Sequence, residues 1–173
     1  MELPLNDFKM GYFILVKGRG WLARRITAHQ LSLGYSRYQA QFTHVGVSGG
    51  GQYIVEVSYP KVRVVDIRER FKGQEILLVK YIGKDYDIKR YKVAFWAASH
   101  CNMRYDWLGI LKFKLKIIWH WRDRDFCSEN AAWALRKEYA DALNMIPHEC
   151  MPARFTGVDF EKIWEGRVDY KLN

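Results

Sequence analysis

The spacing of apolar positions differs between the two halves of the chain. Before residue 83, apolar residues lie in short runs rich in β-branched and aromatic side chains, a composition typical of strands. The runs are Tyr12–Val16, Phe42–Ser58, Val62–Ile67 and Glu75–Ile82, the second of them divided by three glycines. Because strands that follow one another usually pair, we expect a mostly antiparallel sheet.

Three further segments have the three-and-four spacing of helices. The first is the basic stretch Trp21–Leu33, which follows the first strand. The second has apolar residues at Ile88, Tyr91, Phe95 and Ala98. The third begins near Cys127 and has apolar positions at Ala131, Leu135 and Tyr139, with Asp125 and Glu129 at the end where a helix favours negative charge. Strands precede most helices, so the predicted class is α+β with helices packed against the sheet.

The segment Trp107–Arg122 fits two structures. Phe113, Leu115 and Ile117 alternate like a strand, whereas Leu108, Leu111 and Leu115 fit a helix. Its lysines and aromatic residues suit contact with an anionic membrane surface, or an aromatic core element whose lysines are solvated. The choice between strand and helix and the choice between membrane contact and core packing both stay open. The segment is too short and too often interrupted by lysine to span a bilayer.

Composition predicts one basic domain over residues 1–173. No linker, repeat or low-complexity tract divides the 173 residues, 49% of which are hydrophobic. Lys and Arg number 28 against 19 Asp and Glu, a net charge of +9 that suits acidic partners without choosing among them. We expect no nucleic-acid partner, because no nucleic-acid module is recognisable. The N-terminus has no signal-peptide pattern, which predicts a cytoplasmic location.

His44 and Glu56 are predicted to lie close together on the hairpin. If the hairpin turns symmetrically about Gly50, residues whose numbers sum to 100 face each other, and His44 is then opposite Glu56. A shift of two residues leaves the two side chains as diagonal neighbours. A carboxylate in that position holds the imidazole in one tautomer and stabilises its protonated form. Alone, a strand histidine is more often a packed or surface residue.

Cys127 is a candidate nucleophile because of its position at a predicted helix start. A helix N-terminus and a neighbouring imidazolium both lower a thiol pKa, and the thiolate is the reactive form. The backbone N–H of Cys127, which lacks a partner within the helix, is a candidate donor to the oxyanion of a tetrahedral intermediate. The alternative is that Cys127 is a small core residue with no chemical role.

The remaining cysteines and histidines predict neither a disulfide framework nor a metal or cofactor site. Cys101 follows His100, but adjacent helical residues point in different directions, so a core cysteine is the better interpretation. His148, Glu149 and Cys150 lack a second pair of ligands to complete a tetrahedral zinc site.

The order of the motifs resembles a known family. The chain is similar to the permuted papain-like branch of the NlpC-type superfamily, which includes YiiX-like proteins and lecithin:retinol acyltransferase. The motifs that carry this similarity are, in order, Thr43-His44-Val45-Gly46-Val47, Glu56 and Phe126-Cys127-Ser128-Glu129. Tyr105-Asp106 and Met151-Pro152-Ala153 also resemble YiiX-like segments, whereas Gly11-Tyr12 replaces their usual Gly-Asp. The third member of the candidate triad is Glu56 and not a histidine, which favours the YiiX-like proteins over lecithin:retinol acyltransferase.

The resemblance implies a papain-like fold in circularly permuted order, with a barrel-like sheet packed against helices, and a triad of Cys127, His44 and Glu56. Tyr105 and Asp106 are then candidate substrate-site residues. The expected activity is a thiol hydrolase or acyltransferase that acts on an amide, ester or thioester through an acyl-enzyme. A cell-wall peptide, another peptide and a lipid all remain candidate substrates. The alternative is a catalytically silent domain that binds acidic lipid or polymer through its basic surface.

Overall fold

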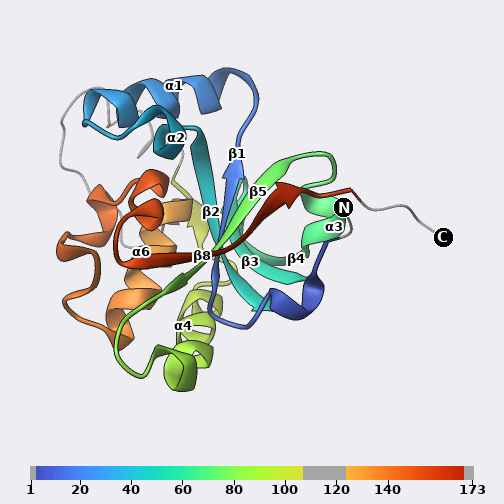
Figure 1. Ribbon diagram of the computed structural model, residues 1–173, viewed down its shortest axis with the longest axis vertical. Helices are drawn as coiled ribbons and strands as arrows, with labels where there is room; N and C mark the ends of the chain where they lie inside the picture. The colour runs from blue at the N-terminus through green and yellow to red at the C-terminus, as the bar shows by residue number, and fades with distance from the viewer. Residues whose placement is uncertain (1–2, 107–123, 170–173) are drawn as a thin grey trace.

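The computed structural model describes residues 3–106 and 124–169, which form an α+β fold as predicted (Figure 1). The strands are β1 (Phe13–Lys17), β2 (Phe42–Gly50), β3 (Tyr53–Ser58), β4 (Lys61–Asp66), β5 (Glu75–Tyr81), β6 (Arg104–Tyr105), β7 (Arg124–Asp125) and β8 (Phe160–Arg167). The helices are η1 (Leu5–Asp7), α1 (Gly20–Ser32), α2 (Arg37–Ala40), α3 (Ile67–Arg70), α4 (Tyr86–Ser99), α6 (Cys127–Glu138), η2 (Ala142–Asn144), η3 (Pro147–Glu149) and η4 (Pro152–Thr156), where η marks a 3-10 helix. The ambiguous segment Trp107–Arg122 lies outside the described residues.

The strands form one sheet in the order β7-β6-β4-β3-β2-β1-β5-β8. All neighbours pair antiparallel except β6 and β7, which confirms the prediction of a mostly antiparallel sheet. The barrel-like closure predicted from sequence is wrong. Closure needs the two edge strands to pair, but within the described residues β8 pairs with β5 alone, and the opposite edge consists of two-residue strands.

The hairpin of β2 and β3 is confirmed, but its register differs from the symmetric arrangement about Gly50. Val47 pairs with Val55, and Ser48 pairs with Ile54. The turn lies one residue further along the chain because Gly50 and Gly51 both have positive φ, and an irregularity falls between Ser48 and Gly50. This shift of two residues makes His44 and Glu56 diagonal neighbours instead of opposite residues.

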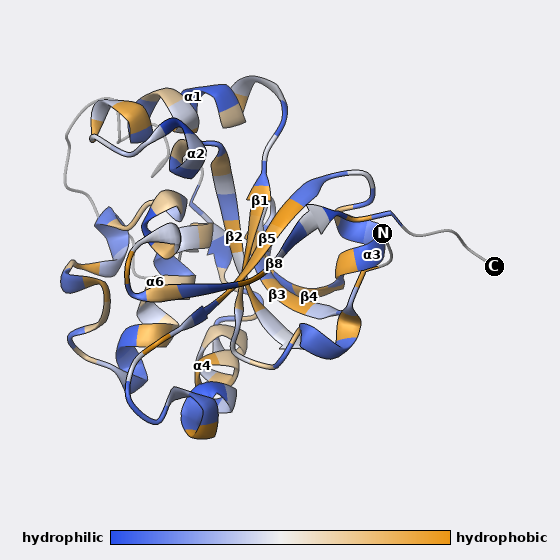
Figure 2. Cartoon of the chain, in the orientation of Figure 1, coloured by the Kyte–Doolittle hydropathy of each residue, from blue (hydrophilic) through white to orange (hydrophobic). Residues whose placement is uncertain are grey.

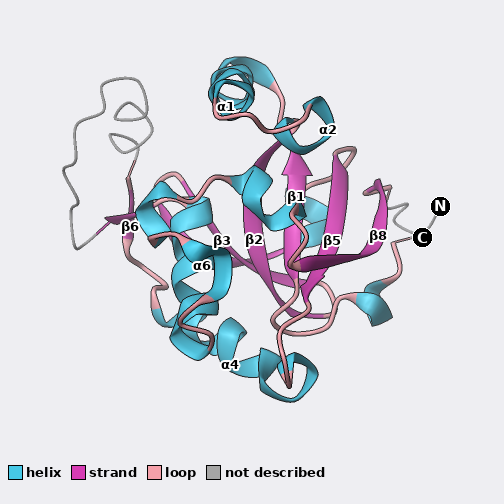
Figure 3. Cartoon of the chain, turned by 60° about the vertical axis from the view of Figure 1, so that its left-hand side comes forward, coloured by secondary structure: helices cyan, strands magenta, loops and turns pink. Residues whose placement is uncertain are grey.

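The centre of the sheet is covered on both faces. The first four residues of β1 are all buried, and Figure 2 shows the central strands as mainly hydrophobic. Helices α4 and α6 pack against each other and against β2 and β3, as Figure 3 shows from the side. Helix α1 lies across the end of the sheet, where it contacts β2 and α2. No helix within the described ranges is long and apolar enough to cross a membrane.

Helix α4 is confirmed, but its buried face is not the one that the spacing of large apolar residues indicates. Ile88, Tyr91 and Phe95 are 73%, 54% and 63% exposed. The buried side is built from Tyr86 and from small residues further along the helix, among them Ala97. Small side chains are needed here because α4 packs closely against α6, so the larger apolar residues project outward.

Gln30 connects the elements that surround one end of β2. Its fully buried side-chain amide donates to the Ala40 and Phe42 carbonyl oxygens, each at 3.0 Å. Its carbonyl oxygen accepts from the Ala153 N–H at 2.8 Å. One side chain thus holds α1 against the end of α2, the start of β2, and η4.

Replacement of Gln30 by leucine tests this connection. The leucine leaves two buried carbonyl groups and one N–H without their partner, so we expect a loss of about 3 kcal/mol in the free energy of unfolding. Urea denaturation followed by tryptophan fluorescence measures it. The control Gln52→Leu, in the turn after β2, is expected to cost less than about 0.5 kcal/mol. Equal costs for both variants would contradict the role of Gln30.

Candidate active site

Cys127 is the first residue of α6, and its sulfur lies where several polar groups converge. The backbone N–H groups of Val45 and Ser128 donate hydrogen bonds to the sulfur, and the side chain of His44 forms a third. The helix N-terminus adds a positive potential at the same point. The sequence-based prediction that Cys127 begins a helix is confirmed.

His44 lies between Cys127 and Glu56. Its Nε2 is 3.2 Å from Glu56 Oε2, and a second hydrogen bond joins its side chain to Cys127. Since an ionised carboxylate can only accept, Nε2 carries the proton toward Glu56 and Nδ1 is the nitrogen available to the thiol. The ring also packs beside Phe71, with 5.8 Å between ring centroids. These contacts fix the position of the imidazole.

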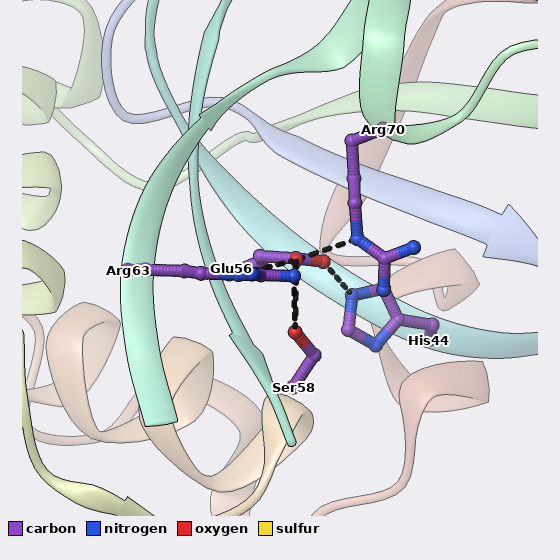
Figure 4. A network of polar contacts seen from close by, with 5 residues as sticks. All are labelled: His44, Glu56, Ser58, Arg63 and Arg70. Carbon is purple, nitrogen blue, oxygen red and sulfur yellow. Dashed lines mark hydrogen bonds and ion pairs between the residues drawn. The ribbon is translucent and has the colours of Figure 1, made fainter. Parts of the chain in front are cut away.

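Glu56 is the most heavily bonded side chain of the site (Figure 4). Its carboxylate is fully buried, and Oε1 accepts from Arg70 Nε at 2.6 Å, Ser58 Oγ at 2.9 Å and Arg63 Nη2 at 3.2 Å. Burial opposes the charged form, but His44 and Arg70 outweigh it and lower the pKa of Glu56 to about 2. The carboxylate is therefore ionised at neutral pH.

The pKa values of Cys127 and His44 move in opposite directions from their ordinary values. Burial disfavours charge on both groups, yet each stabilises the charged form of the other. The pKa of His44 is raised to about 9, and that of Cys127 is lowered. The arrangement favours a thiolate–imidazolium pair, which is the reactive form of a cysteine nucleophile.

The other two cysteines are in environments that disfavour the thiolate. Burial raises the pKa of Cys101, and it raises the pKa of the fully buried Cys150 much further. All three cysteines are free thiols. Cys127 is therefore the only one of the three whose surroundings favour the thiolate.

A pocket of about 530 Å³ gives access to Cys127 and His44. Its walls come from the end of β1, α1, β2, β3, the segment from α3 to β5, and the start of η4. Met151 and Pro152, part of the late proline-containing segment noted in the sequence, line it. The buried Ser128 hydroxyl donates to the Cys150 carbonyl oxygen at 2.6 Å, which ties the start of α6 to this wall.

The two candidate substrate-site residues are placed differently. Tyr105 lines the pocket, where burial and the nearby charges of Cys127 and Asp106 raise its pKa, so the phenol stays protonated. Asp106 is buried and does not line the pocket. Tyr105 can therefore donate a hydrogen bond to a group bound in the pocket.

Sequence analysis missed the two arginines that bind Glu56. Arg63 is directly opposite Glu56 in the pairing of β3 with β4. The turn residues Tyr59 and Pro60 were a usable signal, because a hairpin about them places residues 56 and 63 across from each other. Arg70, which ends the short helix α3, had no comparable signal.

No group of three or more His, Cys, Asp or Glu side chains in the described ranges is arranged to hold a metal ion. Comparison of the chain with protein-family models gave no matching family, and comparison with curated proteins gave no match.

Replacement of Glu56 by glutamine removes the charge that faces three basic side chains. The folded pKa lies below the ordinary value of 4.5, so the carboxylate adds stability that is complete above about pH 4.5 and is lost as the pH falls through about 2. We expect Glu56→Gln to lower the free energy of unfolding by about 3 to 5 kcal/mol at pH 7, and by much less near pH 2.

Urea denaturation at several pH values measures both effects. Glu161→Gln is the matched control, because this exposed carboxylate pairs with Lys80 at the surface. It is expected to cost less than about 1 kcal/mol at any pH. A Glu56→Gln cost that does not change with pH would contradict an ionised, buried Glu56.

Alkylation tests the thiol environments directly. At pH 6 iodoacetamide is expected to label Cys127 faster than Cys101 and Cys150, because only the pKa of Cys127 is lowered. His44→Ala should slow labelling of Cys127 about tenfold or more, whereas His148→Ala should not. Peptide mass spectrometry measures each rate. Equal, slow labelling of all three cysteines is the contrary result.

Proposed function

We propose that this chain is a cysteine-dependent hydrolase or acyltransferase with a permuted papain-like site. Cys127 is the nucleophile, His44 the general base and acid, and Glu56 the residue that orients His44. The observation that carries the proposal is the continuous chain of hydrogen bonds from the Cys127 thiol through the His44 ring to the buried Glu56 carboxylate. This chain opens onto a pocket large enough for a substrate segment.

The order of these residues supports the papain-like class. The histidine and the carboxylate lie on adjacent strands that precede the helix carrying the cysteine, which matches the permuted order implied by the sequence motifs. The geometry is that of nucleophile, base and orienting carboxylate in series, which is the general arrangement for nucleophilic catalysis.

In the first half of the reaction, the Cys127 thiolate attacks the carbonyl carbon of an amide, ester or thioester. The S–C bond forms, and the carbonyl π electrons move to the oxygen. The backbone N–H of Cys127 and the Tyr105 hydroxyl are the proposed donors to that oxyanion. As the tetrahedral intermediate collapses, the bond to the leaving group breaks and the proton on His44 Nδ1 passes to that group.

In the second half, water or an amine attacks the thioester carbon and gives its proton to His44. The S–C bond then breaks, and the thiolate–imidazolium pair is restored. Glu56 keeps its negative charge throughout, because His44 and Arg70 lower its pKa and Arg63 forms a further ion pair with it. Its role is to hold the ring and to stabilise its positive charge.

An activated ester tests the class without knowledge of the natural substrate. p-Nitrophenyl acetate is expected to transfer its acetyl group to Cys127 and release one equivalent of nitrophenolate per site in a burst. Intact-mass and peptide mass spectrometry locate the adduct. Cys127→Ala should abolish the burst, and His44→Ala should slow it roughly 10²- to 10⁴-fold.

Cys101→Ala is the matched control, since it removes a thiol outside the pocket. It is expected to keep the burst at the rate of the unaltered chain. Acetylation that is spread over the lysines, or that persists in Cys127→Ala, would instead favour a catalytically silent domain.

A further inference from the structure

The walls of the Cys127 pocket differ in chemical character. One wall is apolar and is formed by Leu22, Ala23 and Ile26 of α1. The lining also includes the cations Arg19, Arg70 and Lys72, of which Arg19 and Lys72 are exposed and form the rim of the pocket. No carboxylate is among the described residues that line the pocket. A bound molecule therefore meets positive charge with no acidic side chain in the lining to offset it.

Arg19 is held next to the turn that contains Lys72, although the two residues are far apart in the sequence. Arg19 Nη2 donates to the Gly73 carbonyl oxygen at 2.9 Å, which holds the guanidinium against the turn that contains Lys72. The remaining N–H groups of Arg19 are not used by this bond. Neither side chain takes part in an ion pair within the described part of the chain.

The Glu75 carboxylate, which lies near Arg19, is bound more strongly by Lys17 than by Arg19. Glu75 is close enough to Arg19 for its pKa to be affected, but its carboxylate is 2.7 Å from Lys17 Nζ. Arg70 uses its Nε on Glu56, so part of its charge is balanced inside the protein. Arg19 and Lys72 are then the two cations with charge to offer a ligand.

We propose that the acyl substrate of Cys127 carries an anionic group, a carboxylate or a phosphate, which Arg19 and Lys72 bind at the rim while an apolar part lies against α1. This inference rests on the proposed function of Cys127 and names the substrate class of that site. A guanidinium beside an ammonium suits an anionic oxygen pair, because the first supplies a planar fork of donors and the second a compact charge.

Two alkylating reagents of similar size measure the effect. Iodoacetamide is neutral and iodoacetate carries a carboxylate, and with both the thiolate attacks the CH₂ carbon, the S–C bond forms and iodide leaves. The ratio of the iodoacetate rate to the iodoacetamide rate at Cys127 therefore reports how well the pocket accepts an anion. The iodoacetamide rate corrects for any change in the reactivity of the thiol itself.

Arg19→Gln and Lys72→Gln are each expected to lower this ratio about threefold at low salt, and the double variant about tenfold. Arg19→Lys and Lys72→Arg should restore most of it, since they keep the charge. Lys84→Gln removes the same charge from an exposed position outside the pocket lining and should leave the ratio unchanged. Raising the salt concentration should reduce the ratio of the unaltered chain toward that of the double variant.

Inorganic phosphate and acetate, added separately at equal ionic strength, distinguish the two kinds of anion. The one that slows iodoacetate at the lower concentration is the group that the rim prefers. A ratio that is the same in the double variant as in the unaltered chain overturns the inference, even if iodoacetamide labels Cys127 rapidly. If iodoacetamide does not favour Cys127 over Cys101, the proposed function fails and the substrate class fails with it.

Discussion

A buried negative charge on Glu56 is the constraint around which the site is built. Removing a carboxylate from water costs several kcal/mol unless other groups replace the lost hydration. Here Arg63, Arg70, Ser58 and His44 do so, and they come from strands β4, β3 and β2 and from helix α3. The charge can stay buried only if all of these elements keep their relative positions.

The same charge contributes to the protonation of the rest of the site. His44 and Arg70 lower the pKa of Glu56, the ionised Glu56 and the Cys127 thiolate favour the imidazolium of His44, and the imidazolium favours the thiolate of Cys127. The pocket rim then adds further positive charge outside this series. The charge state of the Cys127 sulfur is therefore coupled to the pairing of β3 with β4 and to the position of α3.

Features of this site that depend on residues close in the sequence could be predicted, whereas features that depend on contacts between distant residues could not. Alternation and glycine spacing placed β2 and β3, and the proximity of His44 to Glu56 tolerated an error of two residues in register because diagonal neighbours still meet. The helix start at Cys127 was visible from its context. Tertiary packing determines the contacts of Arg70 and Gln30 and the choice of the exposed face of α4. The spacing of apolar residues does not encode this packing.

The order of His44, Glu56 and Cys127 along the chain also has a consequence for synthesis. His44 and Glu56 are separated by 12 residues and meet within one hairpin, whereas Cys127 belongs to a helix that packs on this hairpin from much later in the chain. Local contacts form faster than distant ones, and a chain emerging from the ribosome exposes its N-terminal part first. The His44–Glu56 pair can therefore form before Cys127 has been translated, so the contact between His44 and Cys127 has to wait until α6 docks.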